Sequence, residues 1–163
     1  MILGGYGRDL TPRELRGAVA RLALRPDAWQ DLVRHDPSQR IYEELHRDEF
    51  LSAWLICWMP GHDTGFHDHD GSSGAVTVVT GSVLEQRIGP HADPIGTIHS
   101  HGEVFDFGPG DVHRVLHRGT APAVTLHAYS PPLAGMGAYV RRGEGFERLD
   151  VPAEHELRPL GAA

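Results

Sequence analysis

The sequence predicts an all-β protein, with one antiparallel β-barrel preceded by two short N-terminal α-helices. The chain has 163 residues, which is enough for one domain with a sizeable core. Its 20 glycines and 12 prolines suit a turn-rich β protein better than a helical bundle. From about residue 40 onward, short β-branched and aromatic runs alternate with turns of Gly, Pro and Asp, as in sandwiches and barrels.

The predicted helical segment has a well-marked start. Thr11 precedes Pro12, and Glu14 follows three residues after Thr11, which is the pattern of a capping box with proline in the first turn. Apolar residues then recur at helical spacing, at Leu15, Val19 and Leu22. A second helix is predicted from Pro26, carrying further apolar residues, and Asp36-Pro37-Ser38 ends it.

The barrel follows as a series of short strands. We expect residues 1–38 to form a helical segment packed on the barrel, residues 39–150 to form the barrel itself, and residues 151–163 to form a C-terminal tail. The predicted strands are 50–58, 75–80, 82–88, 103–107, 111–117, 123–129 and 137–141. No tandem repeat of fixed period is present, so one barrel is expected rather than a repeat array.

Composition excludes several functions. The formal net charge of -7 argues against nucleic acid or an anionic membrane as a partner. The absence of lysine excludes Schiff-base chemistry and a phosphate-binding P-loop. Cys57 is the only cysteine, so neither an internal disulfide nor a zinc knuckle can form. The start of the chain lacks a signal-peptide pattern and the longest apolar run is too short to span a bilayer, which predicts a soluble, cytoplasmic protein.

Three histidines predict a metal site. His67 and His69 are separated by one residue, so on a strand their side chains point to the same face. His113 begins another predicted strand after a glycine-rich turn and can complete a neutral three-nitrogen site. His99 and His101 alternate in the same way but have no matching third ligand, so they are predicted to be structural or supporting. Other histidines, among them His155, are predicted to be surface residues.

The spacing of glycines and histidines resembles the two sequence motifs of the cupin superfamily. The first motif corresponds to Gly61-x5-His67-x-His69-x4-Gly74-x6-Gly81, where Gly74 replaces the glutamate that is usually a ligand. The second corresponds to Gly102-x5-Gly108-x-Gly110-x2-His113-x3-His117. This resemblance implies a single cupin (jelly-roll) barrel. Three histidines without a carboxylate suit iron, but they also suit zinc with a bound hydroxide, so the ligands alone do not select the metal.

A more specific resemblance covers about residues 50–140. Residues 123–132 are similar to the stretch that carries the Ser-His-Tyr relay in cysteine dioxygenase and related bacterial thiol dioxygenases, and residues 55–58 match that family as well. Thr125, which preserves the serine hydroxyl, alternates with His127 and Tyr129, so the three side chains face one side of their strand. A tyrosine held by a histidine can donate a hydrogen bond that orients a reacting group.

The resemblance implies a non-haem iron(II) thiol dioxygenase. It implies that His67, His69 and His113 hold Fe(II), and that Tyr129, positioned by His127 and Thr125, is catalytic. The substrates implied are O2 and a small thiol of the cysteine-like, 3-mercaptopropionate-like or ergothioneine-like type, and the product is a sulfinic acid. A monomer or a homodimer is expected.

The predicted substrate-binding residues are Arg40, Asp70 and Trp58. Counting back from His67 without a gap places Ile41 where the family has its carboxylate-binding arginine. A shift of one residue recovers Arg40, whose planar guanidinium suits a carboxylate. Asp70 makes the mouth of the site acidic, which suits a thiol bearing a cationic group, and Trp58 can shield the site from water.

Two other functional classes stay open. One is a different metal-cupin activity, such as a ring-cleaving dioxygenase or a zinc- or manganese-dependent isomerase, which would act without a thiol. The other is a non-catalytic cupin that binds a small ligand, which needs neither a third histidine nor the Thr-His-Tyr relay.

Overall fold

Helix α1 (Pro12–Ala23) begins at the predicted capping box. The computed structural model describes residues 3–88 and 93–160. In it the Thr11 side chain accepts a hydrogen bond from the Glu14 N–H, and the Glu14 carboxylate accepts one from the Thr11 N–H at 2.8 Å. These two bonds satisfy backbone donors that a helix start otherwise leaves free. The buried face consists of Leu15, Ala18, Val19 and Leu22, as the helical spacing predicted.

The prediction of a second α-helix is wrong. The chain instead forms two short 3-10 turns, η1 (Pro26–Ala28) and η2 (Gln30–Leu32), separated by Trp29. Neither turn buries a residue, and Trp29 uses its indole N–H to bond the carbonyl of Leu22 at 3.1 Å. A helix of this length is stable only when it buries an apolar face. Here Ala28, Trp29 and Val33 are only partly buried against the core, and Leu32 is exposed. Within the described residues, no helix is long and apolar enough to cross a membrane.

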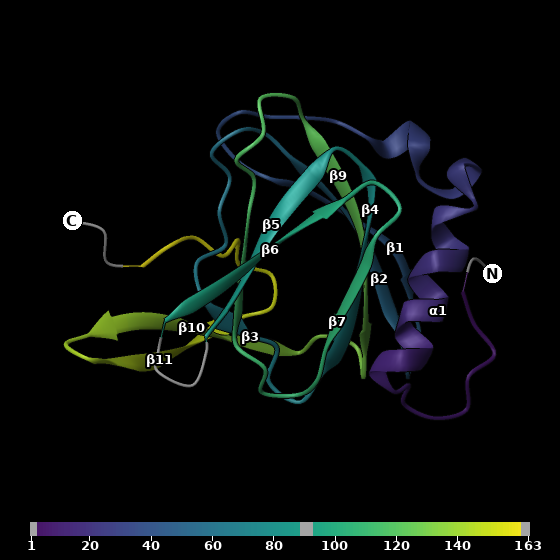
Figure 1. Ribbon diagram of the computed structural model, residues 1–163. Helices are drawn as coiled ribbons and strands as arrows, with labels where there is room; N and C mark the ends of the chain where they lie inside the picture. Colours follow the sequence, from purple (N-terminus) through teal and green to yellow (C-terminus); the bar gives the residue numbers. More distant parts are fainter. Residues whose placement is uncertain (1–2, 89–92, 161–163) are drawn as a thin grey trace.

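The strands form two antiparallel sheets that face one another (Figure 1). The five-stranded sheet has the order β1-β2-β9-β4-β7, with bounds Ile41–Arg47, Ser52–Trp58, Ala123–Ser130, Ser73–Thr80 and Val104–Phe107. The six-stranded sheet has the order β11-β10-β3-β8-β5-β6, with bounds Gly145–Pro152, Gly135–Arg142, His67–Asp68, His113–Leu116, Ser82–Ile88 and Pro94–Ser100.

The five-stranded sheet is covered on both faces. Helix α1 packs on its outer face, against β4, β7 and β9 (Figure 1). Ala53, Leu55 and Cys57 of β2 belong to the cluster that includes this helix, whereas Ile56 and Trp58 belong to the cluster between the two sheets. Alternate residues of a strand point to opposite faces, so coverage of both faces buries almost all of β2, β4 and β9.

The predicted single barrel is corrected to two facing sheets that do not close into a barrel in the described residues. In the described part of the chain, β1 and β7 bound one sheet and β11 and β6 bound the other, so each sheet keeps two edges. Four observed strands, β1, β3, β6 and β11, were not predicted. Strand β3 has only two residues, and β6 and β11 are largely exposed, so none of them carries a clear apolar alternation.

The C-terminal segment returns to the body of the protein. Strands β10 and β11 form a hairpin that projects from the six-stranded sheet (Figure 1). Beyond this hairpin, Leu157 is buried in a small cluster with Met136 and Ala138. Residues that the sequence assigned to a tail therefore pack against the barrel, while the predicted division of the chain into three parts stays a prediction.

Candidate metal centre

Three histidines meet at one end of the space between the sheets. His67 lies on β3, His69 follows directly after that strand, and His113 begins β8, where it is the cross-strand partner of His67. One nitrogen from each ring lies within 4.8 Å of the others. The intervening Asp68 points to the opposite side of β3, as strand alternation requires. The predicted trio is therefore brought together.

Hydrogen bonds orient two of the three rings. His67 Nδ1 bonds the carbonyl of Gly65 at 3.0 Å, and His113 Nδ1 bonds Glu85 Oε1 at 2.9 Å. With Nδ1 engaged in this way, Nε2 of each ring is left as the lone-pair donor for a metal. His69 Nδ1 is buried and has no partner among the described residues. Three imidazole donors with no carboxylate among them fit a divalent transition metal.

Burial keeps the rings of His67 and His69 neutral. Desolvation, followed by the charge of neighbouring imidazoles, places the pKa of His67 and of His69 well below the ordinary value for histidine. Neutral imidazole is the form that binds a metal ion, so no proton has to be displaced at neutral pH. The residues present therefore fit the divalent metal that the sequence predicted.

Glu85 is a part of the site that the sequence did not reveal. This buried carboxylate of β5 bonds His113 at 2.9 Å, His99 Nε2 at 3.1 Å and Arg87 Nε at 3.0 Å. Burial alone raises the pKa of the Glu85 carboxyl, but hydrogen bonds from His113 and His99 outweigh it and hold that pKa below its ordinary range. A negative charge, that of Glu85, is thus hydrogen-bonded to one ligand of the three-histidine site. His99 bonds this carboxylate and so supports the site indirectly, as the sequence predicted.

We expect Glu85→Gln to weaken binding of the metal by about 10- to 100-fold, because an anion bonded to a ligand histidine fixes its orientation and raises its basicity. The measurement is a competition titration of the purified protein with a metal chelator. Glu147→Gln, which alters an exposed carboxylate paired with Arg142, is the matched control. An unchanged affinity in Glu85→Gln would mean that Glu85 only fills space.

Phe107 explains why glycine occupies position 74. A Cβ built on Gly74 would lie 2.2 Å from the Phe107 ring, and that ring stacks on His69 with centroids 4.4 Å apart. Gly74 also pairs with Tyr129 across the sheet. Where the motif usually has a glutamate, the space beside Gly74 is here filled by a phenyl ring.

Gly74→Ala is therefore expected to lower the free energy of unfolding by about 1–3 kcal/mol, because the added methyl group must displace a packed ring. The displaced ring would also press on His69, so metal occupancy should fall together with stability. Denaturant unfolding and metal analysis measure the two effects. Gly71→Ala is the control, since a Cβ at that position meets nothing within 4 Å.

Strand β9 carries the predicted relay, and all of its members are buried. Trp58 Nε1 donates to Thr125 Oγ1 at 2.8 Å, Thr125 Oγ1 bonds His127 Nε2 at 2.7 Å, and His127 Nδ1 bonds the Tyr129 hydroxyl at 3.1 Å. Burial lowers the pKa of His127 to about 3 and raises the pKa of Tyr129 above its ordinary value, so both groups are neutral at pH 7.

The donor pattern sets a direction along this chain. An indole N–H can only donate, so Thr125 Oγ1 accepts a hydrogen bond from Trp58. The Thr125 hydroxyl can then donate its own hydrogen bond to His127 Nε2. His127 then has its proton on Nδ1 and donates to the Tyr129 oxygen. In this pattern the Tyr129 hydroxyl proton remains available to a group in the pocket.

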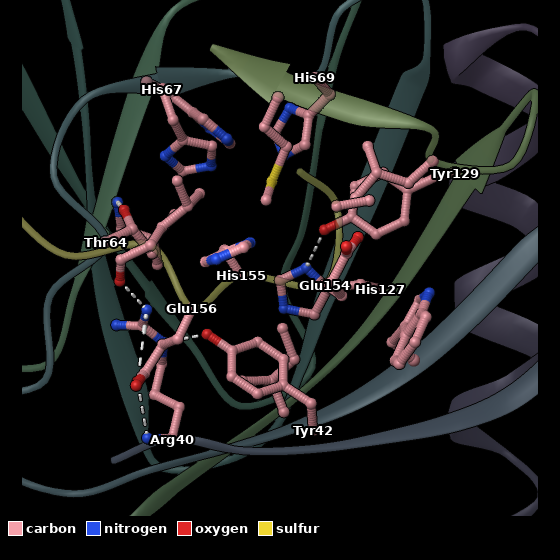
Figure 2. Close-up of a pocket in the computed structure, with 18 of the residues that line it drawn as sticks. Arg40, Tyr42, Thr64, His67, His69, His127, Tyr129, Glu154, His155 and Glu156 are labelled. Carbon is pink, nitrogen blue, oxygen red and sulfur yellow. Dashed lines mark hydrogen bonds and ion pairs between the residues drawn. The ribbon is translucent and has the colours of Figure 1, made fainter. Parts of the chain in front are cut away.

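The metal cluster lines one cavity of about 580 Å³ together with His127 and Tyr129 of the relay (Figure 2). Thr125 lies behind His127 and does not line the cavity. The cavity is also lined by Arg40, Trp58 and the apolar residues Ile56, Val115, Leu133 and Met136. Residues 153–157 of the C-terminal segment complete the wall and include His155, which is exposed, as the sequence predicted, and also lines the cavity. No local pattern in the sequence could show that this segment folds back over the site.

The substrate-binding prediction for Asp70 is corrected. Asp70 is exposed, does not line the cavity, and forms an ion pair with Arg148 on the outer side of the sheet. Arg148 also bonds Asp68 at 2.8 Å, and Asp68 accepts from the Tyr139 hydroxyl at 2.7 Å. The acidic turn therefore anchors β3 from outside. His117 is likewise outside the cavity, with its ring bonded to the carbonyls of Ser82 and Ala121.

Comparison with solved structures assigns the fold. A conserved protein with a double-stranded β-helix domain from Klebsiella pneumoniae subsp. pneumoniae has a TM-score of 0.57 at 20% identity, with 66% of this chain and 90% of that chain covered. A cupin superfamily protein from Desulfitobacterium hafniense has a TM-score of 0.54 at 12% identity, with 63% and 87% covered. The two facing sheets thus have the fold of these cupin structures, and they enclose a buried three-histidine cluster that could hold a metal ion.

Sequence comparison assigns the family. The family model described as cysteine dioxygenase type I matches residues 17–142, and the chain belongs to this family. Cysteine dioxygenase type 1 of Danio rerio is 24% identical over 149 residues, which cover 82% of this chain and 72% of that protein.

Proposed function

We propose that this chain is a non-haem iron(II) thiol dioxygenase that converts a small thiol to a sulfinic acid. The observation that carries the proposal is one cavity lined by a three-histidine cluster and by His127 and Tyr129, with Thr125 bonded to His127 behind the wall. Membership of the cysteine dioxygenase type I family supports the same reaction.

The reaction balances without an external reductant. A thiol R–SH takes up both atoms of O2 to give R–SO2H, so the four electrons that reduce the oxygen atoms all come from sulfur. His67, His69 and His113 would hold the iron through neutral nitrogens. A divalent iron bound there supplies the positive charge that favours the thiolate form of the substrate and the redox chemistry that oxygen needs.

The chain's own residues orient the reactants and exclude water. Tyr129 donates a hydrogen bond from its buried hydroxyl to the reacting group, and His127 and Thr125 hold that hydroxyl in place. Trp58 fixes Thr125 and, with Ile56 and the apolar wall, keeps the interior of the cavity dry. None of these roles requires a member of the relay to become charged.

The test is O2 consumption by the iron(II)-loaded protein with cysteine, cysteamine, 3-mercaptopropionate and ergothioneine, with the mass of each product recorded. Consumption with a gain of two oxygen atoms on one of these thiols is the expected result. Stoichiometric iron without O2 consumption on any thiol would discard the proposal in favour of the other metal-cupin chemistries.

A further inference from the structure

The C-terminal segment, residues 153–157, forms one wall of the cavity that contains the histidine cluster. All five of its residues line the same cavity as His67, His69 and His113. Leu157 anchors the segment by packing on Met136 and Ala138. The segment therefore presents its polar side chains to whatever occupies the cavity.

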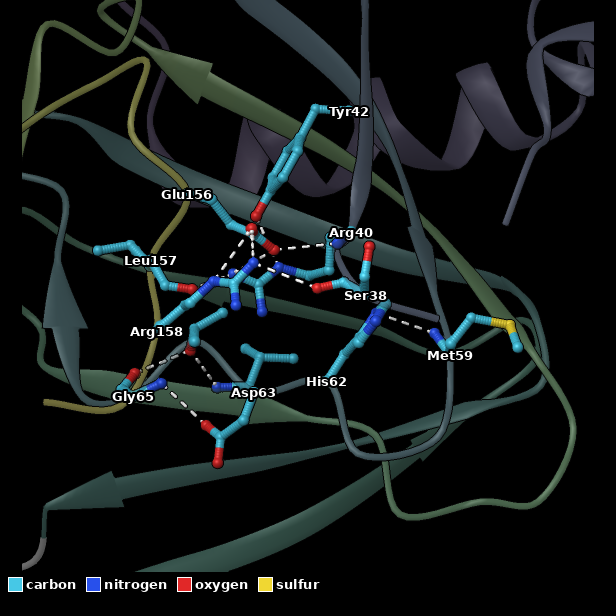
Figure 3. Close-up of polar contacts among 12 residues, drawn as sticks. Ser38, Arg40, Tyr42, Met59, His62, Asp63, Gly65, Glu156, Leu157 and Arg158 are labelled. Atoms are coloured by element: carbon cyan, nitrogen blue, oxygen red, sulfur yellow. Dashed lines mark hydrogen bonds and ion pairs between the residues drawn. The ribbon is translucent and has the colours of Figure 1, made fainter. Parts of the chain in front are cut away.

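Arg40 is committed to holding this segment (Figure 3). Its side chain is buried, with Nε donating to the Tyr42 hydroxyl at 2.6 Å and Nη2 donating to the carbonyl of Leu157. Nη2 also lies 3.6 Å from Glu156 Oε1, and the Arg40 backbone N–H donates to the same oxygen at 2.9 Å. Only Nη1 has no hydrogen bond within the described residues.

This arrangement changes the role predicted for Arg40. A guanidinium grips a carboxylate through two parallel N–H donors on one edge. Nη2 belongs to both edges of the Arg40 guanidinium that could bind a carboxylate in this way, and it already donates to the carbonyl of Leu157 in the C-terminal segment. A substrate carboxylate could reach Nη1 alone, and the charge of Arg40 is already offset by Glu156.

The charges around the cavity leave one unpaired group. Arg47, the other arginine of the lining, pairs with Glu44 at 2.8 Å, and Glu156 also pairs with Arg158 at 2.8 Å. Burial raises the pKa of the Glu156 carboxyl, but hydrogen bonds from the Arg40 backbone and from Arg158 lower it by more, so Glu156 is a carboxylate. Glu154 lines the cavity without a hydrogen bond or ion pair in the described parts of the chain.

We infer that the C-terminal segment determines the substrate class, and that the enzyme selects thiols bearing a cationic amine, which Glu154 binds. This inference rests on the proposed function, because the thiol end of the substrate must reach the histidine cluster. Cysteamine has the required chemistry, whereas 3-mercaptopropionate has a carboxylate where cysteamine has an ammonium group. Arg40 is then a positioning residue for the wall rather than a carboxylate receptor.

The experiment measures the Kd of each thiol without O2, by calorimetry on the iron-loaded protein, and separately kcat/KM from O2 consumption. The wild type should bind cysteamine more tightly than 3-mercaptopropionate. Glu154→Gln should weaken cysteamine binding by about five- to tenfold, as expected for one charge pair at a partly hydrated cavity mouth, and leave 3-mercaptopropionate unchanged. Glu144→Gln, which removes an exposed charge in the β10–β11 turn, should change neither.

Glu156→Gln supplies the reciprocal test. Glutamine keeps an acceptor for the Arg40 backbone but removes the charge that offsets the guanidinium, so affinity for 3-mercaptopropionate should rise. Equal cysteamine affinity in the wild type and Glu154→Gln, or a wild-type preference for 3-mercaptopropionate, would overturn the inference. Selective cysteamine binding without O2 consumption on any thiol would instead overturn only the proposed reaction.

Discussion

His113→Ala is expected to leave the protein unable to hold stoichiometric iron and without measurable thiol oxidation. Replacing an anion that merely supports a ligand costs about 10- to 100-fold in metal affinity, and loss of a ligand itself should exceed that. Among the described residues, His113 is also the only ligand bonded to Glu85, so the variant loses the link between the site and this buried carboxylate.

Iron content after gel filtration measures the first effect, and O2 consumption with the active thiol measures the second. His35→Ala is the control, because His35 is exposed and remote from the cavity. A folded His113→Ala protein with full iron occupancy would remove His113 from the ligand set. Circular dichroism and the midpoint of thermal unfolding separate this outcome from simple misfolding.

The histidine cluster could be predicted because its geometry is local. Strand alternation places His67 and His69 on one face whatever surrounds them, and the glycine-rich turn before His113 marks a second strand. The same alternation predicted that Thr125, His127 and Tyr129 share a face, and their side chains are hydrogen-bonded in a row, with His127 and Tyr129 lining the cavity.

Contacts between distant segments were not predictable in this way. Glu85 lies 28 residues from His113 in the chain, and only the β5–β8 pairing brings the two together. A single carboxylate alternating with the buried Val83 was a faint signal for such a role. Phe107 and Arg40 are comparable cases. The role of Phe107 depends on its packing against Gly74, and the role of Arg40 depends on a C-terminal segment more than 100 residues away in the chain.

The fold was predicted best where both faces of a strand are buried. Strands β2, β4 and β9 carry continuous apolar runs, and their observed bounds lie within two residues of the predicted ones. Exposed strands such as β6 and β11 have no such pattern, since solvent accepts almost any side chain there. The second helix failed for a related reason, because its few apolar residues have no continuous face to bury.

Tyr129→Phe should retain iron and lower kcat about 100-fold, with a much smaller change in KM. Removing one preorganised donor from a buried site typically costs about 10²- to 10³-fold in kcat. The phenyl ring keeps the packing on His69 and Phe107, so the loss is confined to the hydroxyl. Steady-state O2 consumption and iron analysis on the same preparation separate the two quantities. Tyr139→Phe, which removes a hydroxyl outside the cavity, is the control.

Variants at Thr125 separate the effect of how the Tyr129 hydroxyl is oriented from the effect of its presence. Thr125→Val keeps Tyr129 but breaks the bonds from Trp58 and to His127, so kcat should fall by less than in Tyr129→Phe. Thr125→Ser restores a hydroxyl at the same place and should recover most of the activity. A Tyr129→Phe enzyme with the wild-type rate would remove the hydroxyl from the reaction. A valine variant as active as the serine variant would show that Tyr129 acts without the relay behind it.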